Sequence, residues 1–251
     1  MARHTRRRRT EVSVARRRIN ITRCDIVKVA TRRFLTDGYT ATTAKMISDE
    51  VGISTGNLTF YFPTKEHLLA LVIRMLCDFQ WRRMRELTED GTSALLAFCL
   101  ELASVTAGCD GDPVVRDLFL SAYKSPMTLE IIRRNDCERA AGIFGEFCRG
   151  WGETNYKEAE LLVSGIEYTT FMETEFSPGL DVRISGAIGS IMMIYGVPEE
   201  IWRRKVDKVL GMDYRRIGRE LLLEFIEYTG ALTEEEIDSY VTSETTKGDK
   251  V

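Results

Sequence analysis

Residues 43–62 read TAKMISDEVGISTGNLTFYF, and their pattern predicts two short helices joined by a tight turn. Thr43 can cap a helix that runs from residue 44 to residue 51, and Gly52 supplies the left-handed residue that ends it. Ser54 then caps a second helix that continues through Phe62. Two helices joined in this way form a helix–turn–helix, the unit that places its second helix in the major groove of DNA.

The second helix presents two different faces when each residue is turned by about 100° from the one before it. Leu58 and Phe62 share one face, which is expected to bury against the preceding helices. The opposite face is small, polar and aromatic and carries no charge: Gly56, Asn57, Thr59 and Phe60. Amide and hydroxyl groups suit the edges of bases and the methyl group of thymine, so this face is predicted to read DNA sequence.

Charge is distributed unevenly along the chain. Residues 1–65 hold 14 basic and 5 acidic residues, a net charge of +9, whereas the remainder carries −12. Residues 1–20 contain eight arginines and few apolar residues, and they are predicted to form a basic arm that is disordered when free. Helix pairs of this geometry also occur in proteins that bind no nucleic acid, and the basic first quarter favours DNA binding over that alternative.

The segment from residue 21 to residue 69 resembles the DNA-binding domain of the TetR family of bacterial transcriptional regulators. The matching pieces are Phe34, DGY at 37–39, TT at 42–43, Ile47, VGIS at 51–54, GNL at 56–58, FYF at 60–62 and TKE at 64–66. The resemblance implies an all-α homodimer whose small N-terminal domain binds a palindromic operator on double-stranded DNA. It also implies a larger C-terminal domain that holds the dimer interface and a small-molecule pocket.

The same resemblance assigns DNA contacts by position in the motif. It places phosphate contacts on Thr43, Lys65 and either Phe60 or Tyr61. It places base contacts on Lys45, Thr55, Gly56, Asn57 and Thr59, with Ser54 at the start of the reading helix. Thr59 stands where such proteins often carry tyrosine, so the phosphate contact expected there is lost or passes to Tyr61.

The chain is predicted to have three parts: a basic arm over 1–20, a helix–turn–helix domain over 21–66, and a ligand-binding and dimerisation domain over 67–251. Capping residues and helical periodicity predict a bundle of helices for the third part. Their expected ranges are 65–89, 93–107, 113–124, 126–149 with a break, 156–175, 182–195, 198–210, 214–229 and 234–241. Residues 242–251 are expected to be a solvated tail.

Aromatic residues and methionines are frequent in the C-terminal part, and apolar residues with a few polar groups are typical of ligand sites. For each of them an ordinary place in the helical core is the alternative. The candidates are Phe98, Phe119, Tyr123, Phe147, Trp151, Tyr168, Phe171 and Met172. We therefore expect a transcriptional repressor released by a small, largely apolar effector. The alternative is a related DNA-binding protein without a small effector, controlled by a protein partner.

The helices over 156–175 and 182–195 are expected to form the dimer interface. The small residues Gly186, Ala187, Gly189 and Ser190 permit helices to approach closely. The same residues could instead pack within one chain, and the helix after Pro198 is a competing candidate for the interface.

Several other classes of protein are not expected. The chain lacks the GxGxxG, Walker and HExxH motifs, and its two histidines, His4 and His67, offer no catalytic triad. No two of the six cysteines are spaced as CxxC, so we expect neither an enzyme, a metal site nor a cofactor. The longest apolar stretch, residues 184–197, is too short to cross a bilayer, and we expect a cytoplasmic protein without a membrane partner.

Overall fold

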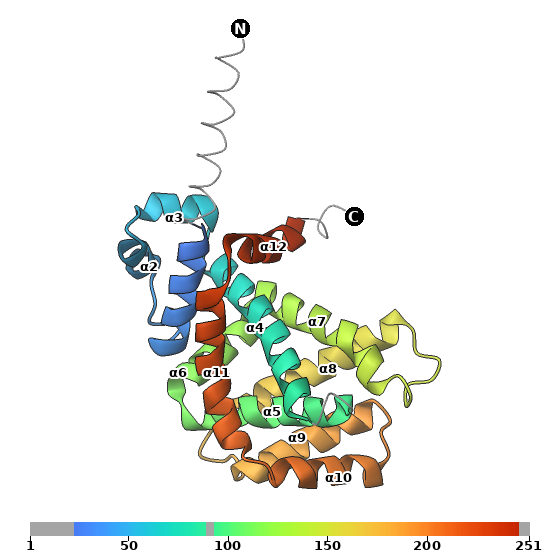
Figure 1. Cartoon of the computed structure of the whole chain (residues 1–251). Helices are drawn as coiled ribbons and strands as arrows, with labels where there is room; N and C mark the ends of the chain where they lie inside the picture. The colour runs from blue at the N-terminus through green and yellow to red at the C-terminus, as the bar shows by residue number, and fades with distance from the viewer. Residues whose placement is uncertain (1–22, 89–92, 246–251) are drawn as a thin grey trace.

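The computed structural model describes residues 23–88 and 93–245, which form helices joined by short connections (Figure 1). No strand occurs within these described residues, and the all-α prediction is confirmed. The predicted basic arm over 1–20 lies outside the described residues.

Three helices form the N-terminal unit: residues 23–36, α2 (Ala44–Val51) and α3 (Thr55–Tyr61). Both predicted caps are present. Thr43 Oγ1 accepts a hydrogen bond from the Met46 backbone nitrogen at 3.2 Å, and Ser54 Oγ accepts one from Asn57 at 3.1 Å. The buried apolar residues of this unit are Ile26, Ala30, Phe34, Ile47, Leu58 and Phe62, and they are continuous with the core of the rest of the chain.

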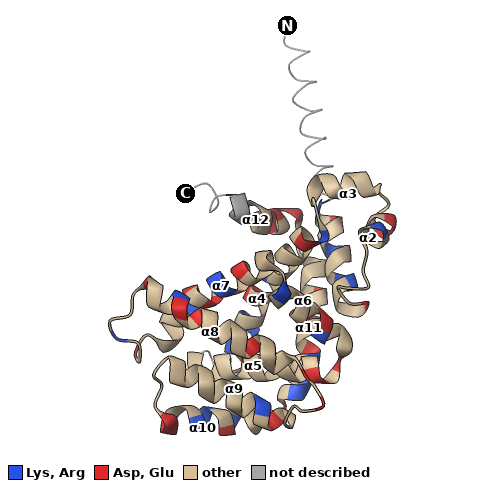
Figure 2. Ribbon diagram, turned by 180° about the vertical axis from the view of Figure 1, so that it is seen from behind, with Lys and Arg blue, Asp and Glu red and all other residues tan. Residues whose placement is uncertain are grey.

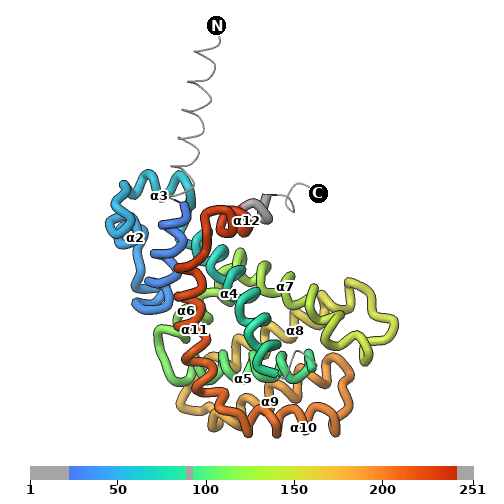
Figure 3. Tube along the Cα trace, in the orientation of Figure 1, coloured from blue at the N-terminus to red at the C-terminus, as the bar shows by residue number. Residues whose placement is uncertain are grey.

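Helix α4 (Lys65–Leu87) carries the chain from the N-terminal unit into the C-terminal bundle (Figure 3). It packs against α5 (Ala94–Gly111), α7 (Pro126–Phe144), α11 (Tyr214–Ala231) and α12 (Glu234–Thr245). The boundary predicted between residues 66 and 67 therefore falls inside a continuous helix, and α4 belongs to both units.

Helix α5 lies at the centre of the bundle. Besides α4, α7 and α11 it contacts α6 (Pro113–Lys124), α8 (Glu153–Phe171), α9 (Leu180–Ile194) and α10 (Glu199–Leu210). It is long and apolar enough to cross a membrane by length and composition, and 67% of it is buried inside the protein. A helix that is apolar on all sides needs such surroundings. The expectation that residues 184–197 are the longest apolar stretch is wrong, because Glu101 is the one charged residue between 94 and 109.

Several helix ends differ from those predicted. Helix α5 continues through Gly108, which the sequence suggested as a stop, to Gly111. A Cβ at Gly108 would lie 3.3 Å from a Val115 side-chain carbon, so this glycine gives space for α6 rather than ending α5. Helix α7 ends at Phe144 instead of residue 149, and α12 reaches Thr245, beyond the predicted start of the tail.

Contacts from α6 and α12 hold the N-terminal unit against the bundle. On α6, Asp117 Oδ2 accepts a hydrogen bond from the Thr40 backbone nitrogen at 2.7 Å. On α12, Asp238 Oδ1 pairs with Arg23 Nη1 at 2.9 Å. In Figures 1 and 3, α12 lies above α4 and beside the N-terminal unit, so the last described helix returns to the first.

A close approach of α5 and α11 at Gly218 gives a test of this packing. A Cβ on Gly218 would lie 2.2 Å from the Ser104 carbonyl oxygen, so Gly218→Ala must push the two helices apart. We expect the free energy of unfolding to fall by about 1–3 kcal/mol in urea denaturation. Gly230→Ala, on the same helix with nothing within 4 Å, is the control and should be neutral or stabilising. Equal stabilisation by both substitutions would contradict the close approach.

Candidate nucleic-acid interface and internal cavity

The predicted DNA-contact residues lie on the surface formed by α2, α3 and the residues that cap them. Leu58 is 1% exposed and Phe62 5%, so the predicted inner face of α3 is the buried one. Figure 2 shows that α3 carries no charged residue. The exposed contact residues are Thr43, Lys45, Ser54, Thr55, Gly56, Asn57, Thr59 and Phe60, whereas Tyr61 and Lys65 are half-buried.

Local hydrogen bonds engage most hydroxyl groups of this surface. Besides Ser54, which caps α3, Thr55 Oγ1 lies 3.2 Å from Ser48 Oγ on α2. Thr59 Oγ1 donates to the Gly56 carbonyl at 3.0 Å. Within the described residues, the Asn57 side-chain amide has no such partner and is exposed. An unengaged amide can both donate to and accept from an adenine edge, so Asn57 is the group best prepared to read a base.

The ammonium groups of both lysines in the predicted interface already have partners within the chain. Lys65 Nζ donates to the carbonyls of Tyr39 and Thr42, both at 2.9 Å, and lies 4.1 Å from the Tyr39 ring centre. Burial lowers the pKa of Lys65. Lys45 Nζ pairs at the surface with Asp49 at 2.9 Å. The phosphate contact of Lys65 stays a prediction, and the structure gives this residue a second role in holding the loop before α2.

A cavity of about 70 Å³ lies between helices α4, α5, α6, α7 and α8. Four of the eight candidate pocket residues line it: Phe98, Phe119, Tyr123 and Phe171. Its other apolar lining residues include Ile73, Leu102 and Ile132. A water-filled space of this size holds only a few molecules, so a larger ligand requires the surrounding helices to move.

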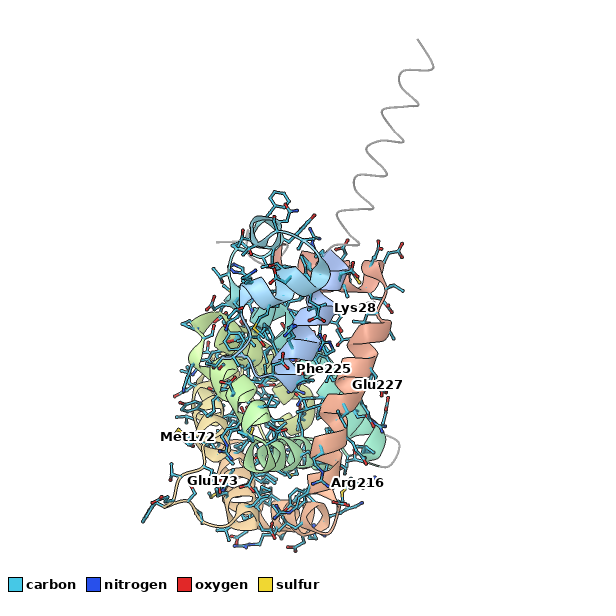
Figure 4. The ribbon with its side chains drawn as sticks, turned by 90° about the vertical axis from the view of Figure 1, so that its left-hand side faces the viewer. Lys28, Met172, Glu173, Arg216, Phe225 and Glu227 are labelled. Atoms are coloured by element: carbon cyan, nitrogen blue, oxygen red, sulfur yellow. The ribbon has the colours of Figure 1, made fainter. Side chains whose placement is uncertain are left out.

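The remaining four candidates lie elsewhere. Trp151 lines a separate groove on the outside of α7 and α8. Tyr168 stacks on Tyr123, with ring centres 6.4 Å apart, but does not line the cavity. Phe147 is a half-buried core residue. Met172 is 38% exposed and lies near Glu173 at the surface (Figure 4).

Part of the cavity lining is polar, and none of these polar residues was predicted from the sequence. They are Gln80, Glu101, Asp136, Arg139, Glu160 and Glu167. Arg139 pairs with Glu101 at 3.2 Å and also with Asp136. A signal for the polar lining was present in α8, where Glu160 and Glu167 share the helical face of the buried residues Val163 and Phe171. Among the described residues, no group of three or more side chains could hold a metal ion.

Glu160 and Glu167 are buried carboxyl groups that each accept a hydrogen bond from a tyrosine. The Tyr195 hydroxyl donates to Glu160 Oε1, and the Tyr123 hydroxyl donates to Glu167 Oε2 at 2.8 Å. Burial, and then the charge of Asp136, raises the pKa of Glu160 to about 8. The same two causes raise the pKa of Glu167 well above its ordinary value. The carboxyl group of Glu160 is therefore mainly protonated at neutral pH, and burial also favours the protonated form of Glu167.

Comparison with known proteins identifies the N-terminal unit. Residues 26–72 match the family described as bacterial regulatory proteins, tetR family. Residues 26–72 therefore form a DNA-binding domain of the TetR type. The matched segment contains α2, α3 and the first turns of α4, whereas the residues that line the cavity begin at Ile73.

Individual relatives match parts of the chain. HbdR of Aromatoleum sp. (strain CIB), an HTH-type transcriptional regulator, is 30% identical over 112 residues, 45% of this chain and 48% of that protein. KstR2 of Mycolicibacterium smegmatis, an HTH-type transcriptional repressor, is 32% identical over 73 residues, 29% of this chain and 36% of that protein. The match thus spans about half the length of the first relative and about a third of the second.

The chain is also similar to solved structures. AmtR of Mycobacterium smegmatis is 17% identical, with a TM-score of 0.38 over 74% of this chain and 93% of that chain. A gamma-butyrolactone receptor described as an ArpA-like protein is 21% identical, with a TM-score of 0.41 over 82% of this chain and 99% of that chain.

The buried carboxyl groups of the cavity predict a stability that falls as pH rises. Because burial raises the folded-state pKa of Glu160 from 4.5 to about 8, the folded protein holds this proton more tightly than the unfolded chain. Stability is then fully present below pH 4.5 and is lost as pH rises through about 8. Glu160→Gln mimics the protonated acid and should reduce the fall between pH 5 and pH 9 by on the order of 3 kcal/mol.

The measurement is urea denaturation across this pH range for the two proteins and for Glu158→Gln, an exposed acid on the same helix. Glu158→Gln should keep the pH dependence of the unchanged protein. Superimposable profiles for the unchanged protein and Glu160→Gln would contradict a proton held at Glu160.

Proposed function

We propose that this chain is a DNA-binding transcription regulator, a repressor that binds a near-palindromic operator as a homodimer in the cytoplasm. The observation that carries the proposal is the exposed, uncharged face of α3, held on the buried Leu58 and Phe62. This face belongs to the segment that matches the tetR family. The names of HbdR and KstR2, a transcriptional regulator and a repressor, support the same role.

Exposed apolar residues support α8, α9 and the loop between them as the dimer interface. Among the described residues, six of the nine exposed large apolar side chains lie between 161 and 193: Leu161, Leu162, Met172, Phe176, Val182 and Met193. Apolar patches of this kind mark protein–protein contacts. Of the small residues on α9, Gly186 is exposed, whereas Gly189 packs within the chain against Trp202 of α10.

The position of the cavity supports release by a small molecule. Helix α4 lines it with Ile73 and Gln80 and begins at Lys65, which holds the loop before α2. Helix α6 lines the cavity with Phe119. Two residues earlier it carries Asp117, which accepts a hydrogen bond from Thr40 of the same loop. A ligand larger than the present space must displace helices around it, and displacement of α4 or α6 links its binding to the position of the DNA-binding unit.

Variants of α3 separate DNA reading from folding. Asn57→Ala and Thr59→Ala are surface changes and should alter the free energy of unfolding by no more than about 0.5 kcal/mol. Loss of a base contact should weaken binding to the operator by about 1–3 kcal/mol while binding to random DNA changes little. Leu58→Ala opens a cavity, should lower the free energy of unfolding by about 2–5 kcal/mol, and should weaken binding to both DNAs.

The three variants are compared by melting temperature and by fluorescence anisotropy on operator and random duplexes at one salt concentration. If Asn57→Ala and Thr59→Ala both keep the full preference for operator, α3 is not the reading helix and this proposal fails at its central step.

A charged residue on α8 tests the dimer interface. Leu162 is 57% exposed in the single chain, so Leu162→Glu should not disturb folding but should place a buried charge in the dimer. We expect sedimentation to show a monomer with weakened operator binding. Leu223→Glu is the matched control, because Leu223 is 63% exposed on α11. A dimer that survives Leu162→Glu and dissociates with Leu223→Glu would place the interface on α11 instead.

A further inference from the structure

The cavity contains more acidic groups than its single base can neutralise. Glu101, Asp136, Glu160 and Glu167 line it, and Arg139 is the basic residue of its lining. Arg139 is already paired with Glu101 and Asp136. The positive charge of Arg139 is therefore shared between these two acids. Glu160 and Glu167 form no ion pair with a basic residue of the cavity lining. The net potential of the cavity is therefore negative whenever either of them ionises.

Three residues that line the cavity have a buried polar atom without a hydrogen-bond partner: Arg139 at Nε, Glu160 and Gln80. Glu160 is 3% exposed, and its Oε2 is unpaired although its Oε1 accepts from Tyr195. Gln80 is 4% exposed, and its Nε2 is unpaired. Buried polar atoms are almost always satisfied, because leaving one unpaired is unfavourable. Glu160 and Gln80 both line the cavity, so a ligand there can supply their missing partners.

The rest of the cavity lining is largely apolar and aromatic. Phe98, Phe119, Phe144 and Phe171 contribute to it, together with the ring of Tyr123. Aromatic faces attract organic cations and also pack against apolar groups. The cavity thus combines an acidic group that has no basic partner with several aromatic rings. This combination suits a cation with an apolar body.

We propose that the effector of this protein is an organic amine, whose ammonium group pairs with Glu160 Oε2 and whose apolar body lies against the phenylalanines. This inference rests on the effector role given to the cavity under the proposed function. It revises the largely apolar effector expected from the sequence by adding one positive charge. Binding expels the proton of Glu160 to solvent, so that an ammonium–carboxylate pair replaces a neutral acid and the total charge is conserved.

Glu160 also marks the path by which a ligand reaches the cavity. It lines both the inner cavity and the outer groove between α7 and α8. The groove has a volume of about 1010 Å³ and is lined further by Glu130, Trp151 and Lys157. Arg133, on the groove side, donates to Ser164 Oγ at 2.8 Å and so leaves Glu160 Oε2 unpaired. A ligand that moves from this groove into the cavity passes Glu160, which lines both.

The test compares three small probes of similar shape and different charge on the full-length protein: phenethylamine, 2-phenylethanol and phenylacetate. Isothermal titration at pH 8 should show phenethylamine binding about tenfold or more tightly than 2-phenylethanol, with phenylacetate the weakest. Titration in buffers of different ionisation enthalpy should show release of a proton. Between pH 6.5 and pH 8.5 the amine stays charged, and its affinity should rise about tenfold as Glu160 becomes easier to deprotonate.

Variants assign the selectivity to a residue. Glu160→Gln keeps the shape of the side chain and should remove most of the preference for the amine and the proton release. Glu227→Gln, an exposed acid on α11 (Figure 4), should leave both unchanged, because α11 contributes no residue to the cavity. Glu167→Gln provides a second variant should Glu160→Gln not fold, and it should reduce the preference partially.

The outcomes separate this inference from the proposed function. Equal or tighter binding of 2-phenylethanol or phenylacetate, no binding of phenethylamine at millimolar concentration, or an unchanged preference in Glu160→Gln overturns the amine assignment. Operator binding is measured on the same samples. Specific operator binding without amine preference leaves the regulator and removes the amine, whereas amine preference without any DNA binding keeps the site and removes the regulator.

Discussion

The loop between Gly38 and Thr42 is the constraint on which the arrangement of the two units depends. Gly38 has φ +94°, and a Cβ there would lie 3.1 Å from an Asp117 oxygen, so both its conformation and its surroundings require glycine. Lys65 binds two carbonyls of the loop, and Asp117 binds the Thr40 backbone nitrogen. Helices α4 and α6 thus form hydrogen bonds to the same few residues, which lead directly into the cap of α2.

These hydrogen bonds couple the cavity mechanically to the DNA-binding unit. The two helices that hold the loop are also walls of the cavity, and helix packing transmits displacement because protein interiors are close to incompressible. A ligand that separates α4 from α6 cannot leave both Lys65 and Asp117 in place on the loop. Coupling of about 1–3 kcal/mol, typical of such linked sites, is enough to change occupancy of an operator five- to about 150-fold.

Local signals in the sequence predicted most of the fold, because capping and helical periodicity depend on near neighbours. The caps at Thr43 and Ser54, the inner face of α3 and the order of the helices are all present.

The pocket was predicted less well, because it depends on the phase of each helix. On α8 the face of Glu160, Val163, Glu167 and Phe171 meets the cavity. Tyr168 is turned about 100° away from this face, and Met172 lies beyond the end of the helix. Lys65 could not be assigned to its loop, because the carbonyls it binds lie 23 and 26 residues earlier.

The acids of the cavity show a conflict between folding and recognition. Glu160 lies on a helical face otherwise suited to apolar packing, and its burial raises its pKa, so it opposes folding as the solution becomes less acidic. An apolar residue in its place would pack more stably, as buried ionisable groups often show when they are replaced. Residues that lower stability and also face a ligand space are characteristic of binding sites, where recognition and stability make opposite demands. A cation that pairs with Glu160 removes the penalty in the folded state alone, and the energy recovered in this way is available to move the walls of the cavity.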